Sequence, residues 1–172
     1  MKAIMMTVRL WWFYLTYKGI KKIEIRKRFT KDFKGKIFEC VSKTNWKKDL
    51  MKIPEEEREF FKQFVGKVGL CFECDKVDDY ANGHKWSWEQ GAPMWGACND
   101  YEYILKDTCL TDDELREYVE DLSFSAIHIT KLEIFDKSKE LKEFTPRYED
   151  RAGVYYGYPL SRAPQSFCFI EV

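Results

Sequence analysis

The chain has 172 residues, of which 45% are hydrophobic and 17% aromatic, a composition that suits one domain with a substantial core and excludes a disordered chain. No apolar run reaches the roughly 18 residues of a membrane-spanning helix, and the N-terminus lacks the pattern of a signal peptide. Six scattered cysteines fit reduced thiols better than a disulfide scaffold. We therefore expect a cytoplasmic protein that is not bound to membranes.

The zero net charge hides a strong asymmetry along the chain. Residues 1–52 contain 15 Lys and Arg against 4 Asp and Glu, and the remainder contains 14 against 25. The basic third is suited to an anionic partner. Alternatively, folding brings the two regions together so that their fields cancel, and the sequence leaves both readings open.

Hydrophobic patterning predicts a first strand over 3–8 and a short helix over 10–17 that ends at Gly19. The alternation that follows predicts a strand over 20–28. The remaining predicted elements, in chain order, are a turn over 31–35, a strand over 36–42, a helix over 54–64 closed by Gly66, a strand over 68–77, a helix that begins at the Thr111–Glu114 capping box and includes Leu122, a strand over 127–135 and a closing strand over 166–172.

Two segments, 78–99 and 145–163, show no regular pattern and are expected to be irregular connections. Strands outnumber helices, and the two do not alternate regularly. This arrangement indicates an α+β fold with a mixed, barrel-like sheet.

Residues 19–26 (GIKKIEIR) fit the pattern G-x-K-x-x-E-x-R, which resembles the signature of the ASCH family of the PUA-like superfamily. Segments 1–9, 66–77, 127–144 and 159–172 are also similar to small stand-alone members, which are common in phages and prophages. The resemblance implies a PUA-like mixed β-barrel with flanking helices. It also implies a single domain over residues 1–172, with an irregular insertion around 78–110.

The resemblance further implies that the motif lines a cleft that binds RNA, a nucleotide or a modified nucleoside. Gly19 permits a tight turn and close approach of a ligand. Lys21 and Arg26 supply cationic donors for phosphates or base carbonyls. Glu24 accepts hydrogen bonds from an exocyclic amine, and Arg9, before the helix, is expected to assist.

A simpler alternative is that Lys22, Glu24, Arg26 and Arg28 form the solvent-exposed face of an amphipathic strand. Strand parity places Lys21 on the face opposite Glu24 and Arg26. For the three motif side chains to converge, Lys21 must therefore lie in the turn before the strand, or a bulge must redirect it.

Catalysis is a second hypothesis. Some relatives hydrolyse N4-acetylcytidine with the motif lysine and a threonine, but in this chain Glu24 stands three residues after Lys21. An amidohydrolase would use Lys21 as base or nucleophile and Glu24 as proton shuttle, and other relatives are proposed to be ribonucleases. The third hypothesis is a phage protein that binds a host protein through its irregular middle segment. We rank a binding protein above an enzyme.

A zinc site formed by Cys71 and Cys74 with His84, Cys98 or Cys109 is ranked lower, because residues three apart in a strand face opposite sides. We expect buried reduced cysteines and no metal. His128 is expected to be a hydrogen-bonded core histidine, and Trp86, Trp88 and Trp95 to fill a small secondary core. No phosphate-binding glycine loop is present, so we expect no cofactor, and the sequence does not indicate an oligomeric state.

Overall fold

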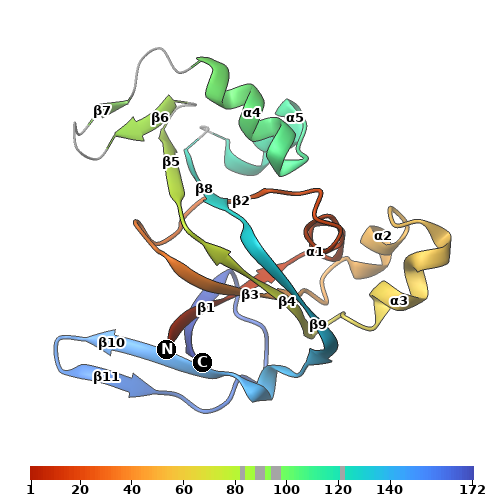
Figure 1. The fold of residues 1–172 in the computed structure, drawn as a ribbon, viewed down its shortest axis with the longest axis vertical. Coiled ribbons are helices and arrows are strands. Elements are labelled where there is room, and N and C mark those ends of the chain that lie inside the picture. Colours follow the sequence, from red (N-terminus) through yellow and green to blue (C-terminus); the bar gives the residue numbers. More distant parts are fainter. Residues whose placement is uncertain (82–83, 88–91, 94–97, 121–122) are drawn as a thin grey trace. The chain divides into compact units, whose positions relative to one another are not determined.

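The computed structural model describes residues 1–81, 84–87, 92–93, 98–120 and 123–172 (Figure 1). The chain divides into two compact units. Unit 1 comprises 1–18, 35–73 and 131–172, and unit 2 comprises 19–34 and 74–130. Each unit contains a sheet of its own.

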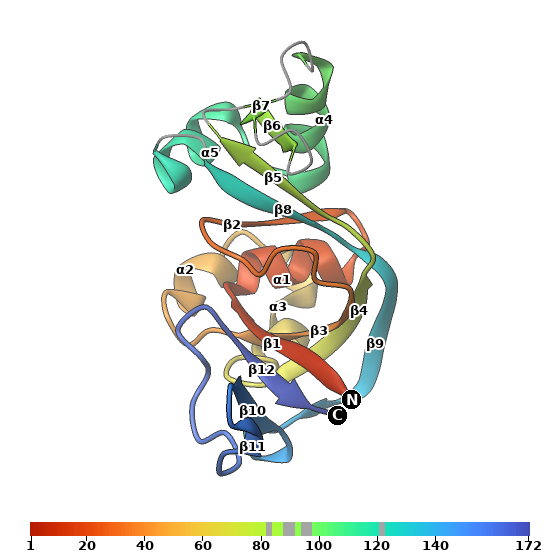
Figure 2. The same ribbon diagram turned by 90° about the vertical axis from the view of Figure 1, so that its left-hand side faces the viewer.

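Unit 1 is built on a mixed seven-stranded sheet in the order β11-β10-β12-β1-β3-β4-β9. Strand β1 is parallel to β3 and antiparallel to β12, so the first and last strands of the chain are neighbours near the middle of the sheet. Figures 1 and 2 show the two termini side by side. The strands are β1 (Lys2–Val8), β3 (Gly35–Val41), β4 (Val68–Cys74), β9 (Thr130–Lys139), β10 (Thr145–Asp150), β11 (Gly153–Tyr156) and β12 (Phe167–Glu171).

The helices of unit 1 pack on this sheet through aromatic side chains. The ring of Phe13 lies 6.5 Å from that of Phe61 and 5.1 Å from that of Phe64, between centroids. Gly69 on β4 makes this close packing possible, because a Cβ atom there would lie 2.6 Å from atoms of the Phe13 and Phe64 rings. The helices are α1 (Leu10–Tyr17), α2 (Trp46–Leu50), η1 (Glu55–Glu57), α3 (Arg58–Lys62) and η2 (Leu141–Glu143).

Unit 2 is built on a five-stranded sheet in the order β2-β8-β5-β6-β7. Its core joins Ile23 and Ile25 of β2 to Ile104 of the first helix and Leu115 and Val119 of the second. Both helices therefore cover the sheet with their apolar faces. The elements are β2 (Ile23–Arg26), β5 (Val77–Ala81), β6 (His84–Ser87), β7 (Ala92–Pro93), β8 (Phe124–His128), α4 (Cys98–Thr108) and α5 (Asp112–Val119).

Several predicted elements are confirmed. The helix over 10–17 is α1, and Gly19 has a positive φ of 66° as expected of a helix-terminating glycine. The capping box is present, with the Thr111 hydroxyl accepting from the Glu114 backbone N–H at 3.2 Å. The first and closing strands are β1 and β12. Leu122, expected at the end of α5, lies outside the described residues.

Other predicted elements are wrong in extent. The strand expected over 20–28 contains only Ile23–Arg26, the helix over 54–64 is divided into η1 and α3, and the strands over 68–77 and 127–135 are each divided in two. The segment 145–163, expected to be irregular, contains the hairpin β10–β11. Every residue of β11 is exposed. Because neither face of β11 is buried, its sequence carries no alternation that could have revealed a strand.

The α+β architecture with a mixed, sheet-rich core is confirmed. In the described part of the chain the seven-stranded sheet runs from β11 to β9 without pairing its two ends, so closure into a barrel stays a prediction, as does the single-domain assignment. No helix within the described ranges combines the length and apolarity needed to cross a membrane.

Candidate functional site

The G-x-K-x-x-E-x-R motif lies in unit 2, where it leads into the edge strand β2. Strand β2 pairs antiparallel with β8, with Ile23 opposite His128. The backbone N–H of Lys22 donates to the Asp107 carbonyl at the end of α4 (2.7 Å), and the Lys22 carbonyl accepts from Ile129 (2.9 Å). These bonds fix the backbone around Lys21, which precedes the strand as convergence of the motif requires.

The three charged side chains of the motif meet. The Lys21 ammonium contacts one carboxylate oxygen of Glu24, and an Arg26 guanidinium nitrogen lies 2.9 Å from the other. Only 5%, 7% and 12% of the Lys21, Glu24 and Arg26 side chains, respectively, is exposed. We call this cluster the motif triad.

Glu24 is ionised because of its two cationic neighbours. Burial alone would raise the pKa of its carboxyl group, but Lys21 and Arg26 outweigh that effect and hold the pKa below its ordinary value. With Glu24 ionised, the motif triad carries one net positive charge. The alternative of a solvent-exposed charged face is wrong for Glu24 and Arg26, although Lys22 and Arg28 are exposed.

The motif triad has the donors that an anionic or carbonyl-bearing ligand needs. A lysine ammonium carries three N–H donors and an arginine guanidinium five, and Lys21 and Arg26 each make a contact with the Glu24 carboxylate. Glu24 therefore orients both cations. A buried charged cluster of this kind is expensive to desolvate, and such clusters are common at binding and catalytic sites.

Sequence reasoning considered Cys109 as a possible zinc ligand but did not associate it with the triad. Cys109 follows α4 with a φ of 59°. Burial raises the pKa of its thiol, and the positive charge of Lys21 acts in the opposite direction, so the ammonium is close enough to influence the sulfur. Because 88 residues separate the two in sequence, no local spacing could have indicated their proximity.

Arg9 belongs to unit 1 and makes its main contact there. Its guanidinium donates to both carboxylate oxygens of Asp49, with 3.0 Å between Nε and Oδ2. Asp49 is 1% exposed, so Arg9 neutralises a buried charge. A contribution of Arg9 to ligand binding stays a prediction.

The described residues of the lower-ranked candidates, His128 and the cysteines, have the surroundings of structural residues. His128 is half-buried, and its Nε2 lies 2.9 Å from Asp78, consistent with a hydrogen-bonded structural histidine. Burial raises the pKa of the Cys71 and Cys74 thiols to about 11, so both are protonated at neutral pH. No group of three or more metal-ligating side chains occurs among the described residues. The side chains of His84, Trp86 and Cys98, together with residues Trp88 and Trp95, lie outside them.

Comparison with known proteins gives a match at the level of the fold. No family model matches the sequence, and no curated protein matches it. Among solved structures, the ASCH protein of Zymomonas mobilis is similar, with a TM-score of 0.55 and 12% identity over 96% of this chain and 85% of that one. Two of its mutant forms give TM-scores of 0.58 at 12% identity, over 96% of this chain and 85% and 87% of theirs. The protein described here therefore has an ASCH-like fold.

Proposed function

We propose that the protein binds RNA or a nucleotide through the motif triad of Lys21, Glu24 and Arg26. The observation that carries the proposal is the convergence of the three motif side chains on one another, with Glu24 ionised between two cations. The ASCH-like fold supports it, because the fold matches the family that the motif resembles. As part of the same proposal, the sheet closes into a PUA-like barrel and the protein is a phage-type member of the family.

In this proposal the triad is the unliganded form of the site. The buried cations exchange part of their contact with Glu24 for a phosphate or a base carbonyl, while the carboxylate accepts from an exocyclic amine. Arg26 is the first to respond, because it keeps the largest exposed fraction of the three side chains. Its planar fork suits bidentate contact with a phosphate or a guanine-like edge.

The test is a titration of single-stranded RNA oligonucleotides, followed by fluorescence anisotropy at several salt concentrations. We expect affinity to fall with salt and Arg26→Gln to weaken binding about tenfold or more, as for loss of a charged hydrogen bond of about 1.5–3 kcal/mol. Arg28→Gln is the matched control, because it removes the same charge from an exposed position two residues away. Equal losses of affinity in the two variants would show that RNA is attracted by overall positive charge and not by a specific contact with Arg26. Unchanged affinity in both variants would defeat the proposal.

A hydrolase acting on N4-acetylcytidine-type nucleosides is the second candidate, because the Lys21 ammonium contacts the Glu24 carboxylate directly. An ionised Glu24 can take a proton from the Lys21 ammonium, and the resulting neutral amine can then accept a proton from a water molecule that attacks the amide carbonyl, while the Glu24 proton passes to the departing amine of cytidine. Incubation with N4-acetylcytidine, with cytidine measured by chromatography, tests this candidate. Release of cytidine that disappears in Lys21→Met and persists in Lys22→Met would support it, whereas no release by the unaltered protein would remove it.

A further inference from the structure

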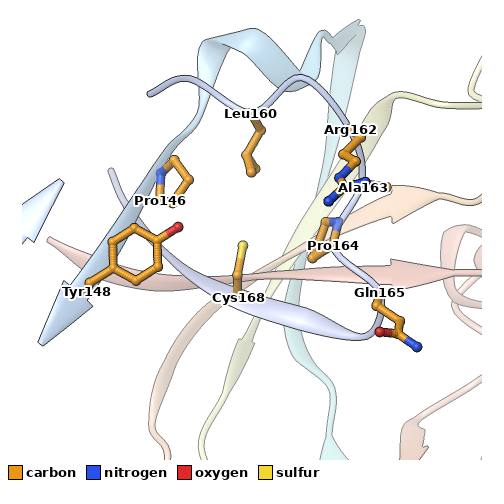
Figure 3. Close-up of a pocket in the computed structure, with 8 residues that line it drawn as sticks. All are labelled: Pro146, Tyr148, Leu160, Arg162, Ala163, Pro164, Gln165 and Cys168. Atoms are coloured by element: carbon orange, nitrogen blue, oxygen red, sulfur yellow. The ribbon is translucent and has the colours of Figure 1, made fainter. Parts of the chain in front are cut away.

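A cavity of about 410 Å³ lies in unit 1 and is separate from the motif triad. Its walls come from β10, from β12 and from the segment 157–166 that precedes β12 (Figure 3). This volume is within the range of about 300–1,000 Å³ of small-molecule sites. The lining residues are Pro146, Tyr148, Leu160, Arg162, Ala163, Pro164, Gln165 and Cys168.

The segment that closes the cavity is fixed at both ends. The backbone N–H of Gly157 donates to the carbonyl of Pro146 in β10 (3.0 Å), and that of Leu160 donates to the carbonyl of Phe144 just before this strand (2.9 Å). At the other end, Thr7 of β1 donates its hydroxyl to the Pro164 carbonyl (2.6 Å) and its backbone N–H to that of Ser166 (2.9 Å). The cavity is therefore held open by the backbone of the fold and is not a gap under a loose loop.

Five of the eight lining residues have apolar side chains. Leu160, Ala163 and Cys168 pack against the buried core of unit 1, and Figure 3 shows Leu160 and Cys168 pointing toward each other across the space. Burial raises the pKa of the Cys168 thiol, so this thiol is neutral. The rings of Pro146 and Pro164 form walls on opposite sides, which leaves a space bounded by flat faces.

One charged residue lines the cavity, and it is a cation. The Arg162 guanidinium is directed toward the middle of the space in Figure 3, and none of the eight lining residues is acidic. Within the described part of the chain Arg162 makes no ion pair. Arg147 of the same unit, by contrast, is neutralised by Glu149 and Glu171. The cavity thus offers an uncompensated positive charge above an apolar floor.

An aromatic platform borders the same space. The rings of Tyr148 and Tyr155 are stacked at 5.9 Å between centroids with an interplanar angle of 23°, and Tyr148 is half exposed. Gly157 leaves room for this ring, because a Cβ atom there would lie 3.1 Å from it. A flat ligand ring entering the cavity would meet an aromatic surface that is already ordered.

We propose that this cavity binds a small anion that carries a planar aromatic base, of the nucleoside monophosphate class. The phosphate contacts Arg162, whose fork matches its oxygens, and the base lies among Tyr148, Pro146 and Pro164. This site is independent of the motif triad and of the function proposed for it.

Isothermal titration of adenosine 5′-monophosphate into the full chain tests the proposal. Arg162→Gln is expected to weaken binding at least tenfold, whereas Arg151→Gln, at a second exposed arginine that does not line the cavity, changes it less than twofold. Adenosine and inorganic phosphate alone are expected to bind at least tenfold more weakly than the monophosphate. In NMR spectra the ligand should shift the backbone amides of Leu160 and Cys168.

Three outcomes overturn the proposal. The first is absence of saturable binding to the unaltered protein. The second is equal affinity of the Arg162→Gln and Arg151→Gln variants, both of which alter exposed side chains and should leave the fold intact. The third is a set of shifted amides centred on Glu24 rather than on Leu160, which would assign the ligand to the motif triad instead.

Discussion

Replacement of Glu24 by glutamine tests the electrostatics of the motif triad directly. The triad carries two positive charges and one negative charge, and Glu24→Gln removes the carboxylate that both buried cations contact. Removing one member of a buried ion cluster typically costs about 3–5 kcal/mol. Lys21→Met removes one cation and keeps the contact between Glu24 and Arg26, so we expect it to cost less than Glu24→Gln.

The assay is urea denaturation at pH 7, with Glu59→Gln as the matched control. Glu59 loses the same charge from an exposed pair with Lys62 at 3.3 Å, for which we expect a loss of less than about 1 kcal/mol. The order of cost should therefore be Glu24→Gln, then Lys21→Met, then Glu59→Gln. If Lys21→Met proved as costly as Glu24→Gln, the charge-balance reasoning would be refuted.

The unfolding free energies of the unaltered protein and of Glu24→Gln should also depend differently on pH. The pKa of Glu24 is lowered in the folded state, so its contribution to stability is present above its unfolded pKa and is lost as the pH falls through the folded one. Glu24→Gln has no such group. The difference in unfolding free energy between the unaltered protein and Glu24→Gln should therefore shrink as the pH falls below about 4.5, and a difference that stayed constant would contradict the assignment.

Gly69→Ala would place a methyl group against the rings of Phe13 and Phe64, and we expect a loss of about 1–3 kcal/mol in thermal unfolding from overpacking; unchanged stability would show that the rings can move. Thr111→Ala removes the cap of α5 and should cost about 0.5–2 kcal/mol by urea denaturation, with Thr111→Ser largely restoring it. Cys40 is fully buried, and burial raises the pKa of its thiol to about 12, so its labelling by a thiol reagent at pH 8 should require unfolding, as mass spectrometry of labelled peptides would reveal.

Strong local signals in the sequence were sufficient for part of the fold. Helix α1 was predictable because an apolar run ends at Gly19, and α5 because the capping box depends only on residues three apart. The hairpin β10–β11 was not predictable, because the residues of β11 are all exposed and their sequence shows no alternation of apolar and polar residues. Helix α4 was missed because it lies in the segment 78–110 that was interpreted as an irregular insertion, although Ile104, Leu105 and buried Thr108 follow helical spacing.

Part of the candidate site was likewise predictable from local sequence and part of it was not. The motif pattern identified Lys21, Glu24 and Arg26 because all three lie within six residues, and their meeting depends on one turn. Burial of Glu24 was not predictable, because alternation alone places it on the face opposite Ile23 and Ile25, whereas the structure buries both faces of β2. Long-range proximity, such as that of Cys109, depends on packing of α4 against β2, which no local pattern encodes.

The position of β12 between β1 and β10 has a consequence for biosynthesis. During translation, β1 can pair with β3 but has no neighbour on its other side until β12 emerges from the ribosome. The strands of unit 2 are all available before that moment. During translation, unit 2 is therefore expected to acquire its sheet first, and the nascent chain has an open edge at β1 that can pair with other strands until β12 is available.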